Sequence, residues 1–183
     1  MSVRPTLRDI ELIDAVEALP TEPFSGHVFR AVADGRDPLT CWHPKARWDD
    51  GYIDVLYTSL SEDGALTEVR YHLNNQQPFA PDFGRQRRLF RIPVSGLQVI
   101  AFRTLHSLEA LGVDVNIWGR SSYVSLGDEY LRTQEIAAAA EFHERDGLLV
   151  PSARSDELNL VVLMQSAVDA HCGEPEDLGL RDL

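Results

Sequence analysis

The sequence predicts an α+β fold with a mixed, mostly antiparallel sheet flanked by helices. Short segments rich in β-branched and aromatic residues recur along the chain, and several are joined by short turns. Helical segments interrupt them at irregular intervals, which argues against the regular βαβ alternation of a doubly wound sheet. The 183 residues are 44% hydrophobic and 25% charged, a composition typical of one domain with a sizeable core.

The first third of the chain is expected to begin with a helix that packs on the main body. Apolar residues recur at steps of three in TLRDIELIDAVEAL, residues 6–19. Strands are predicted over GHVFRAV (26–32) and YIDVLYTSL (52–60), with a loop rich in Gly and Pro between them. Ser61 is well placed to cap the helix that follows the second strand.

The middle of the chain predicts two strands and a short helix. RRLFRIPV (87–94) and GLQVIAFRTL (96–105) are expected to be joined by a turn at Ser95–Gly96, and Ser107 is expected to cap the helix. RQRRLFR (85–91) is the densest basic stretch. The favoured interpretation is a solvated edge strand whose charge discourages aggregation, and the alternative is a site for phosphate or an acidic partner.

The last third contains the clearest helix and two further strands. DEYLRTQEIAAAAEFHERDG (128–147) carries acidic residues in its first turn and ends at Gly147, a predicted C-cap. LLVPSA (148–153) and LNLVVLM (158–164) are predicted strands. The domain prediction is a helical extension at 1–23, a main domain at 24–169, and an acidic, loosely ordered tail at 170–183.

Charge and composition exclude several classes of protein. The formal net charge of −12 argues against direct nucleic-acid binding. No apolar run approaches 18 residues, and the acidic start is unlike a signal peptide, so we expect a cytoplasmic protein without a membrane span. Two cysteines are too few for a disulfide framework. No phosphate-binding glycine loop, nucleophile elbow or common zinc motif occurs, so no metal is expected.

Five short motifs follow one another in an order that resembles the RES domain family. They are VFR (28–30), ARW (46–48), VLYTS (55–59), ALTE (65–68) and PSAR (151–154), and the resemblance spans roughly residues 24–165. The family pattern has a glycine before Arg-Trp, where this chain has Ala46.

The resemblance implies a fold, an activity and a partner. RES domains are similar to the ADP-ribosyltransferase fold, and studied members cleave the nicotinamide–ribose bond of NAD⁺ by phosphorolysis or hydrolysis. The family therefore implies NAD⁺ as substrate, with phosphate or water as co-substrate and no cofactor. It also implies the toxin of a bacterial toxin–antitoxin pair, with an Xre-type helix-turn-helix antitoxin as partner. A homo-oligomer is possible.

The resemblance also implies which residues carry the catalytic chemistry, and each has a plainer structural interpretation. Arg47 would clamp the pyrophosphate, but it also fits a surface ion pair. Tyr57 would hold the nicotinamide ring, or is a core tyrosine. Glu68 would stabilise the ribosyl cation, or is an exposed helix glutamate. Ser152 would bind the substrate or orient Glu68, or is a turn serine.

The predicted substrate-binding residues are Arg30, Ser59, Arg154 and Gln134. Two other functions use the same motifs. The first is an ADP-ribosyltransferase that modifies a protein target, and the second is a non-catalytic binding module that retains the fold.

Overall fold

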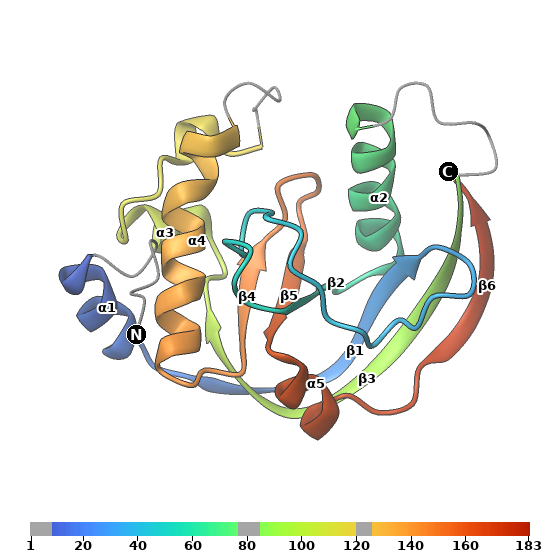
Figure 1. Cartoon of the computed structure of the whole chain (residues 1–183), viewed down its shortest axis with the longest axis horizontal. Coiled ribbons are helices and arrows are strands. Elements are labelled where there is room, and N and C mark those ends of the chain that lie inside the picture. Colours follow the sequence, from blue (N-terminus) through green and yellow to red (C-terminus); the bar gives the residue numbers. More distant parts are fainter. Residues whose placement is uncertain (1–8, 77–84, 120–125) are drawn as a thin grey trace.

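The computed structural model describes residues 9–76, 85–119 and 126–183 (Figure 1). The helices are α1 (Ile10–Glu17), α2 (Glu62–Gln76), α3 (Leu105–Glu109), α4 (Leu126–Phe142) and α5 (Gln165–His171), with a 3₁₀ turn η2 (Val115–Ile117). The strands are β1 (Glu22–Val32), β2 (Val55–Ser59), β3 (Gln86–Ala101), β4 (Gly147–Pro151), β5 (Leu158–Leu163) and β6 (Glu176–Asp182).

The strands form one sheet in the order β1-β2-β5-β4-β3-β6, and β1 also pairs directly with β3. Every strand pair is antiparallel except β3 with β4, which run parallel. Helices flank this sheet, so the predicted α+β class with a mixed, mostly antiparallel sheet is confirmed. The long strands β1 and β3 curve beneath the short central strands, and α2 and α4 stand well apart from each other (Figure 1).

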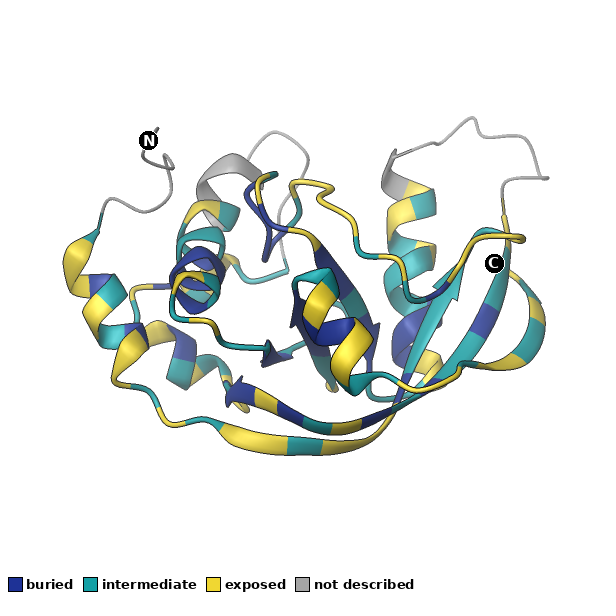
Figure 2. Ribbon diagram, turned by 60° about the horizontal axis from the view of Figure 1, so that its bottom comes forward, coloured by how far each residue is buried: buried dark blue, intermediate teal, exposed yellow. Residues whose placement is uncertain are grey.

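The hydrophobic core has two main parts, one on each face of the central strands. Leu148 and Val150 of β4 pack in a cluster with α1, α3 and α4, whereas Leu149 packs in a second cluster with α5, β1 and β3. Successive side chains of a strand point to opposite faces, so β4 and β5 are buried on both sides. In Figure 2, buried residues are concentrated in the central strands. This explains the continuous apolar runs of the sequence.

The N-terminal helix packs on the main body. The Asp9 carboxylate caps α1 by accepting from the Leu12 backbone N–H at 3.0 Å, and it also pairs with Arg132 of α4 at 2.7 Å. Leu12 and Val16 are buried against the first core cluster. The predicted helix start and the rest of residues 1–8 lie outside the described residues.

The two strands predicted around Ser95–Gly96 are one continuous strand, β3, so the predicted turn is wrong. Gly96 has φ +68, which glycine adopts at no steric cost, and the register with β1 shifts nearby, between Phe24 and Gly26. The chain therefore passes Gly96 with an irregularity in pairing instead of reversing. The Ser95–Gly96 pair therefore marks a distortion within the strand, not a turn between two strands.

The basic stretch is not an edge strand, because β3 pairs with β1 on one side and with β6 on the other. Arg88 donates to Asp34 and to Asp177, both at 2.7 Å, and Arg91 pairs with Glu176. Arg88 and Arg91 of this stretch thus pair with acidic side chains of β6. The tail predicted to be loosely ordered forms a strand over Glu176–Asp182, and that prediction is also wrong.

Two helix boundaries differ from their predictions. Helix α4 ends at Phe142, and Gly147 begins β4, where an added Cβ would lie 2.8 Å from the Val161 carbonyl oxygen. This glycine therefore serves close strand packing, not a helix C-cap. Helix α3 begins at Leu105 with Thr104 as its N-cap, so Ser107, the predicted cap, lies inside the helix. The Ser107 hydroxyl donates to the Thr104 carbonyl. Within the described ranges, no helix is long and apolar enough to cross a membrane.

Candidate active site

A cavity of about 560 Å³ opens between α2 and the β1–β2 connection, over strands β1, β2 and β5. This size falls within the usual range for sites that bind small molecules. Residues from several elements far apart in the sequence line it: Phe29, Arg30, Ala31, Trp42, Pro44, Lys45, Ala46, Arg47, Trp48, Tyr57, Thr58, Ser59, Ala65, Glu68, Val69, Tyr71, His72, Tyr130, Pro151, Ala153, Arg154, Asn159 and Val161.

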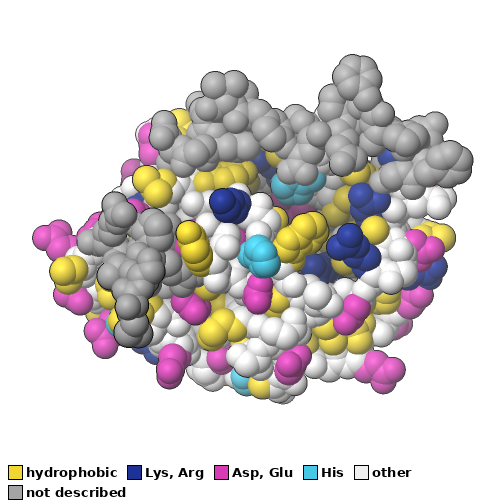
Figure 3. Space-filling model, in the orientation of Figure 1, with side chains coloured by type: hydrophobic (Ala, Val, Ile, Leu, Met, Phe, Trp, Pro, Cys, Tyr) yellow, Lys and Arg dark blue, Asp and Glu magenta, His cyan; other side chains and the backbone are white. Residues whose placement is uncertain are grey.

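The cavity is basic although the protein is acidic. Among the described residues that line it, four side chains are cationic and Glu68 is the one carboxylate; the cations are Arg30, Lys45, Arg47 and Arg154. On the face shown in Figure 3, several Lys and Arg side chains gather to the right of the middle, whereas Asp and Glu side chains are most numerous along the left and lower edges. Such a concave, positively charged surface attracts anionic ligands to a protein that otherwise repels them.

Glu68 is held by hydrogen bonds from two strands. Its Oε1 accepts from the Ser152 hydroxyl at 2.8 Å and from the Asn159 side-chain amide at 3.0 Å. Asn159 is oriented in turn by the Ser59 hydroxyl, which donates to its Oδ1 at 2.8 Å. Both bonds to Glu68 use the same oxygen, and no residue in the described part of the chain donates to Oε2. A carboxylate that is fixed through Oε1, and whose Oε2 accepts no hydrogen bond from the described residues, is suited to stabilise positive charge on a ligand.

Ser152 is occupied in a structural network and is not set up as a nucleophile. It is buried, and its hydroxyl donates to Glu68 while accepting from the backbone N–H groups of Arg154 and Ser155 at 3.0 and 3.2 Å. Of the interpretations of this serine, the orientation of Glu68 and the local turn are therefore both present in its contacts. Ser152 itself does not line the cavity, although Pro151 and Ala153 do.

Arg47 lies between two aromatic rings. Its guanidinium carbon is 4.1 Å from the centroid of Trp118 and 4.8 Å from that of Tyr130, and only 8% of the residue is exposed. The Thr133 hydroxyl donates to the Arg47 carbonyl at 2.6 Å, which fastens the loop to α4. This arginine is therefore mostly buried, and its cation is held in a fixed plane at the cavity wall.

Two side chains accept hydrogen bonds from the backbone of the loop that carries Arg47 and hold it in place. Tyr57 hydroxyl accepts from the Trp48 backbone N–H at 3.0 Å, and burial raises the pKa of Tyr57 well above its usual value, so the phenol stays neutral. The fully buried Asp49 carboxylate accepts from the backbone N–H groups of Ala46 and Gly51 at 2.9 and 2.8 Å. Burial raises the pKa of Asp49, and these donors oppose that shift.

Ala46 fits the position where the family pattern has glycine. Its φ is not positive; the left-handed residue of the loop is Lys45, at φ 55. The Ala46 carbonyl accepts from the Gln134 amide of α4 at 2.8 Å. Gln134 therefore lies behind the loop and does not line the cavity.

Two further arginines lie at the cavity, and each has a protein partner. Arg30 Nη1 donates to the carbonyl oxygens of Pro38 and Thr40 at 2.6 and 3.0 Å, and burial lowers its pKa. The Arg154 guanidinium carbon lies 3.4 Å from the centroid of the Tyr71 ring. Because Tyr71 belongs to α2, this contact places the Arg154 cation beside the helix that carries Glu68.

The fold brings most of the predicted site residues to one cavity. Arg30, Arg47, Tyr57, Ser59, Glu68 and Arg154 line it, Ser152 contacts Glu68, and Gln134 supports the loop from behind. Asn159 was missed. It is the one polar residue inside the predicted strand LNLVVLM, and an amide within an apolar strand is a signal that could have found it.

No group of three or more His, Cys, Asp or Glu side chains that could hold a metal occurs among residues 9–76, 85–119 and 126–183. Cys41 and Cys172 are both free thiols. Burial lowers the pKa of His72, which lines the cavity one turn after Glu68, so this imidazole is neutral at pH 7.

Comparisons with known proteins identify a family and a similar fold. The model of the RES domain family matches residues 17–180, a wider range than the motifs span. The fold is similar to that of a chain in the crystal structure of the M. tuberculosis MbcT–MbcA toxin–antitoxin complex. That likeness has a TM-score of 0.67 and 23% sequence identity, and it covers 100% of this chain and 94% of the other. A search of curated proteins found no match.

Proposed function

The chain belongs to the RES domain family, and on that premise we propose that it is an enzyme that cleaves the nicotinamide–ribose bond of NAD⁺. We further propose that it acts in the cytoplasm as the toxin of a toxin–antitoxin pair. The observation that carries the proposal is a basic cavity around one fixed carboxylate, Glu68. A dianionic pyrophosphate next to a ribose that becomes cationic is the substrate chemistry that this charge pattern fits.

The cationic side chains would bind the pyrophosphate of NAD⁺. Arg47 is the best-ordered candidate, because its guanidinium is stacked between two rings and its backbone is fastened to α4. A planar guanidinium offers paired donors to phosphate oxygens. Arg154 and Lys45 would add charge, whereas the bonds of Arg30 to Pro38 and Thr40 give it a larger part in holding the β1–β2 connection.

Glu68 would act where the bond breaks. The bond between the ribose anomeric carbon and the pyridinium nitrogen breaks with its electron pair going to the nitrogen, so nicotinamide leaves as a neutral molecule and requires no general acid. The ribosyl group gains positive charge, as in glycoside hydrolysis. A carboxylate beside it, kept in place by Ser152 and Asn159, lowers the energy of that transition state.

The second reactant is phosphate or water. A phosphate oxygen bonding to the anomeric carbon gives ADP-ribose 1″-phosphate, and a water oxygen gives ADP-ribose and a proton. In both reactions one C–O bond forms as the C–N bond breaks, and nicotinamide is released. The Tyr57 ring at the cavity wall is proposed to contact nicotinamide, and the hydroxyl of Ser59 to act through Asn159.

A toxin of this kind requires a partner that restrains it. The similar fold in a toxin–antitoxin complex supports a proteinaceous antitoxin, and the RES family suggests one of the Xre helix-turn-helix type. We propose that the antitoxin covers the cavity around Arg47 and Glu68, since closing that opening excludes NAD⁺.

The first prediction tests the enzyme activity with Glu68→Gln. Purified protein and NAD⁺, with or without phosphate, should yield free nicotinamide and one of the two ribosyl products, measured by chromatography. The amide keeps the shape of Glu68 but removes its charge, so kcat should fall by about 10²–10³-fold, the scale of removing one electrostatic stabiliser. In cells, toxicity and the loss of NAD⁺ should disappear together.

Glu62→Gln is the matched control, because Glu62 is an exposed residue of the same helix and does not line the cavity. It should retain wild-type activity. If NAD⁺ persists while a cellular protein gains the mass of ADP-ribose, the chain is a transferase. If Glu68→Gln leaves toxicity intact, the cavity is a binding site without chemistry.

A further inference from the structure

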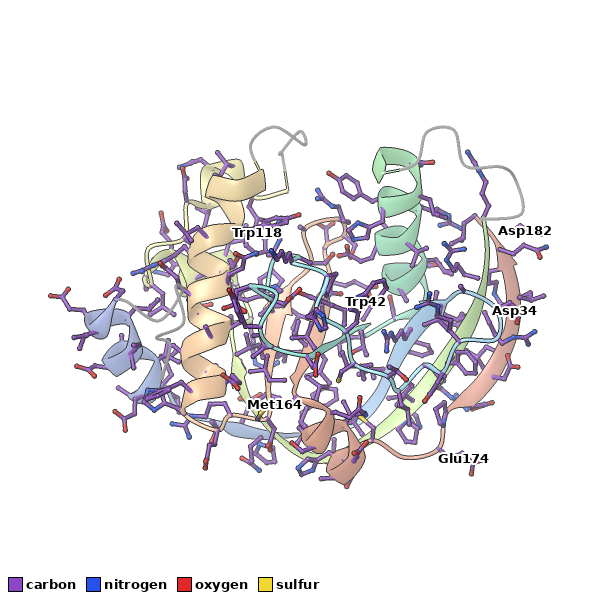
Figure 4. The ribbon with its side chains drawn as sticks, in the orientation of Figure 1. Asp34, Trp42, Trp118, Met164, Glu174 and Asp182 are labelled. Atoms are coloured by element: carbon purple, nitrogen blue, oxygen red, sulfur yellow. The ribbon has the colours of Figure 1, made fainter. Side chains whose placement is uncertain are left out.

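Trp42 is a large aromatic residue that lines the cavity and is nevertheless 55% exposed. Trp48, six residues later, also lines it but is only 3% exposed. An indole left in water at the rim of a binding cavity presents a flat, apolar and polarisable face to whatever enters. Figure 4 shows Trp42 on the side of the β1–β2 connection that faces α2, with Trp118 on the opposite side.

The exposure of this ring does not come from a loose loop. The Trp42 backbone exchanges both hydrogen bonds with Val55 at the start of β2, at 2.9 and 2.8 Å. The segment just before it is held from two directions. Arg30 bonds the carbonyls of Pro38 and Thr40, and Gln165 of α5 bonds the Leu39 carbonyl at 3.2 Å and the Cys41 N–H at 2.9 Å. The ring is thus displayed on an ordered backbone.

Trp42 lies at the end of the cavity remote from the ribose chemistry. It pairs with Val55, at one end of β2, whereas Ser59, at the other end, connects through Asn159 to Glu68. The two ends, Val55 and Ser59, are four residue steps apart, or about 13 Å along the strand. A dinucleotide likewise carries two heterocycles separated by two riboses and a pyrophosphate.

We propose that Trp42 is the stacking surface for the adenine of the dinucleotide, and that it sets the preference for a dinucleotide over a mononucleotide. This inference rests on the proposed function, since it assigns the second ring of the same substrate. Arg36 lies with its guanidinium carbon 5.6 Å from the Trp42 centroid, which supports the indole by a cation–π contact. Stacking between a base and an aromatic side chain is worth about 1–3 kcal/mol.

The second prediction concerns Trp42→Ala. The KM for NAD⁺ should rise by about 5–150-fold, which is that stacking energy converted at about 1.4 kcal/mol per tenfold, with kcat within about twofold of wild type. Cleavage of nicotinamide mononucleotide, which has no adenine, should be unchanged. Trp42→Phe keeps a ring and should recover most of the affinity.

Tyr52→Ala is the matched control: Tyr52 is 68% exposed on the same connection but does not line the cavity. It should leave the KM for NAD⁺ unchanged. A Trp42→Ala variant with an unchanged KM for NAD⁺, or with equal losses for NAD⁺ and the mononucleotide, overturns the assignment.

Binding of adenosine 5′-monophosphate, measured by calorimetry, separates the two proposals. If wild type cleaves no NAD⁺, the proposed function fails, and the assignment of Trp42 is then decided by this titration alone. Weaker binding to Trp42→Ala than to Tyr52→Ala supports the stacking surface. Equal binding to both variants, or no binding to wild type, rejects it.

Discussion

At the scale of single residues, the site depends on what holds Glu68. Ser152 and Asn159 both donate to one oxygen, and they reach it from different strands. Neither is a charged group, so their contribution is to fix the carboxylate in one orientation. Small displacements of a catalytic group cost large factors in rate, which makes these positioning residues.

The third prediction is that Asn159→Ala lowers kcat for NAD⁺ about 10–100-fold with little change in KM, because Glu68 loses one donor while the cations remain. The double variant with Ser152→Ala should be less impaired than the product of the two single effects, since both residues serve the same oxygen. Steady-state kinetics measures both.

Asn116→Ala is the control, an exposed asparagine whose amide bonds only its neighbour Asp114 among the described residues. It should behave as wild type. Full activity in Asn159→Ala would show that Glu68 needs no support from β5.

At the scale of elements, strand and helix types were predictable where local pattern decides them, and boundaries failed where tertiary packing decides them. Alternating apolar residues identified β2, and largely continuous apolar runs identified β4 and β5. Nothing local distinguishes Gly96 inside a strand from a turn glycine, because the difference lies in pairing with β1. Strand β6 was missed since its residues are mostly polar and exposed, and pairing with β3 is what makes them a strand.

The residues of the site likewise divide into those predictable from local motifs and those placed by tertiary packing. The ordered motifs named most residues of the cavity wall because each motif is local. Gln134 was placed among substrate contacts, yet its amide supports the Ala46 carbonyl, and this is a property of how α4 packs on the loop. Asn159 and Trp42 belong to no motif and come to the site through strand pairing alone.

Helix α5 begins at a strained residue, and this carries the fourth prediction. Met164, its N-cap, has φ 69 and ψ 144, a region that is nearly restricted to glycine and costs about 1–3 kcal/mol for other residues. Met164→Gly should therefore be more stable than Met164→Ala by about 1–2 kcal/mol, although glycine usually destabilises ordered elements.

Urea unfolding of the two variants measures the difference. Both remove the same side-chain contacts apart from one methyl group, so the comparison isolates the backbone. If the alanine variant is the more stable of the two, the strain at Met164 is absent.

At the scale of the whole molecule, the acidic C-terminal segment completes the sheet. Strand β6 covers one side of β3 and supplies Leu178 to the cluster around buried Leu89. Its Asp177 and Glu176 pair with Arg88 and Arg91 of β3, which compensates these four charges on this surface. The segment is part of the fold, not an appendage.

The fifth prediction is that deletion of residues 174–183 lowers the free energy of unfolding by several kcal/mol and promotes aggregation, because it uncovers Leu89 and leaves β3 with an unpaired edge. Urea unfolding and light scattering measure the two effects.

A double variant, Glu176→Gln with Asp177→Asn, keeps the strand but removes its ion pairs with Arg88 and Arg91. It should lose less than about 1 kcal/mol, since exposed pairs contribute little. A deletion that costs no more than this double variant would mean that β6 does not contribute to stability by covering β3.

The long separation of the Glu68 partners along the chain has a consequence for protein synthesis. Ser152 follows Glu68 by 84 residues and Asn159 by 91, so the carboxylate leaves the ribosome long before the groups that hold it. At about 5–20 residues per second, that delay is about 5 to 20 s. Under the proposed function, a nascent or truncated chain is harmless to the cell that makes it. Activity begins only after β5 has been synthesised, and that interval is the time available for an antitoxin to be ready.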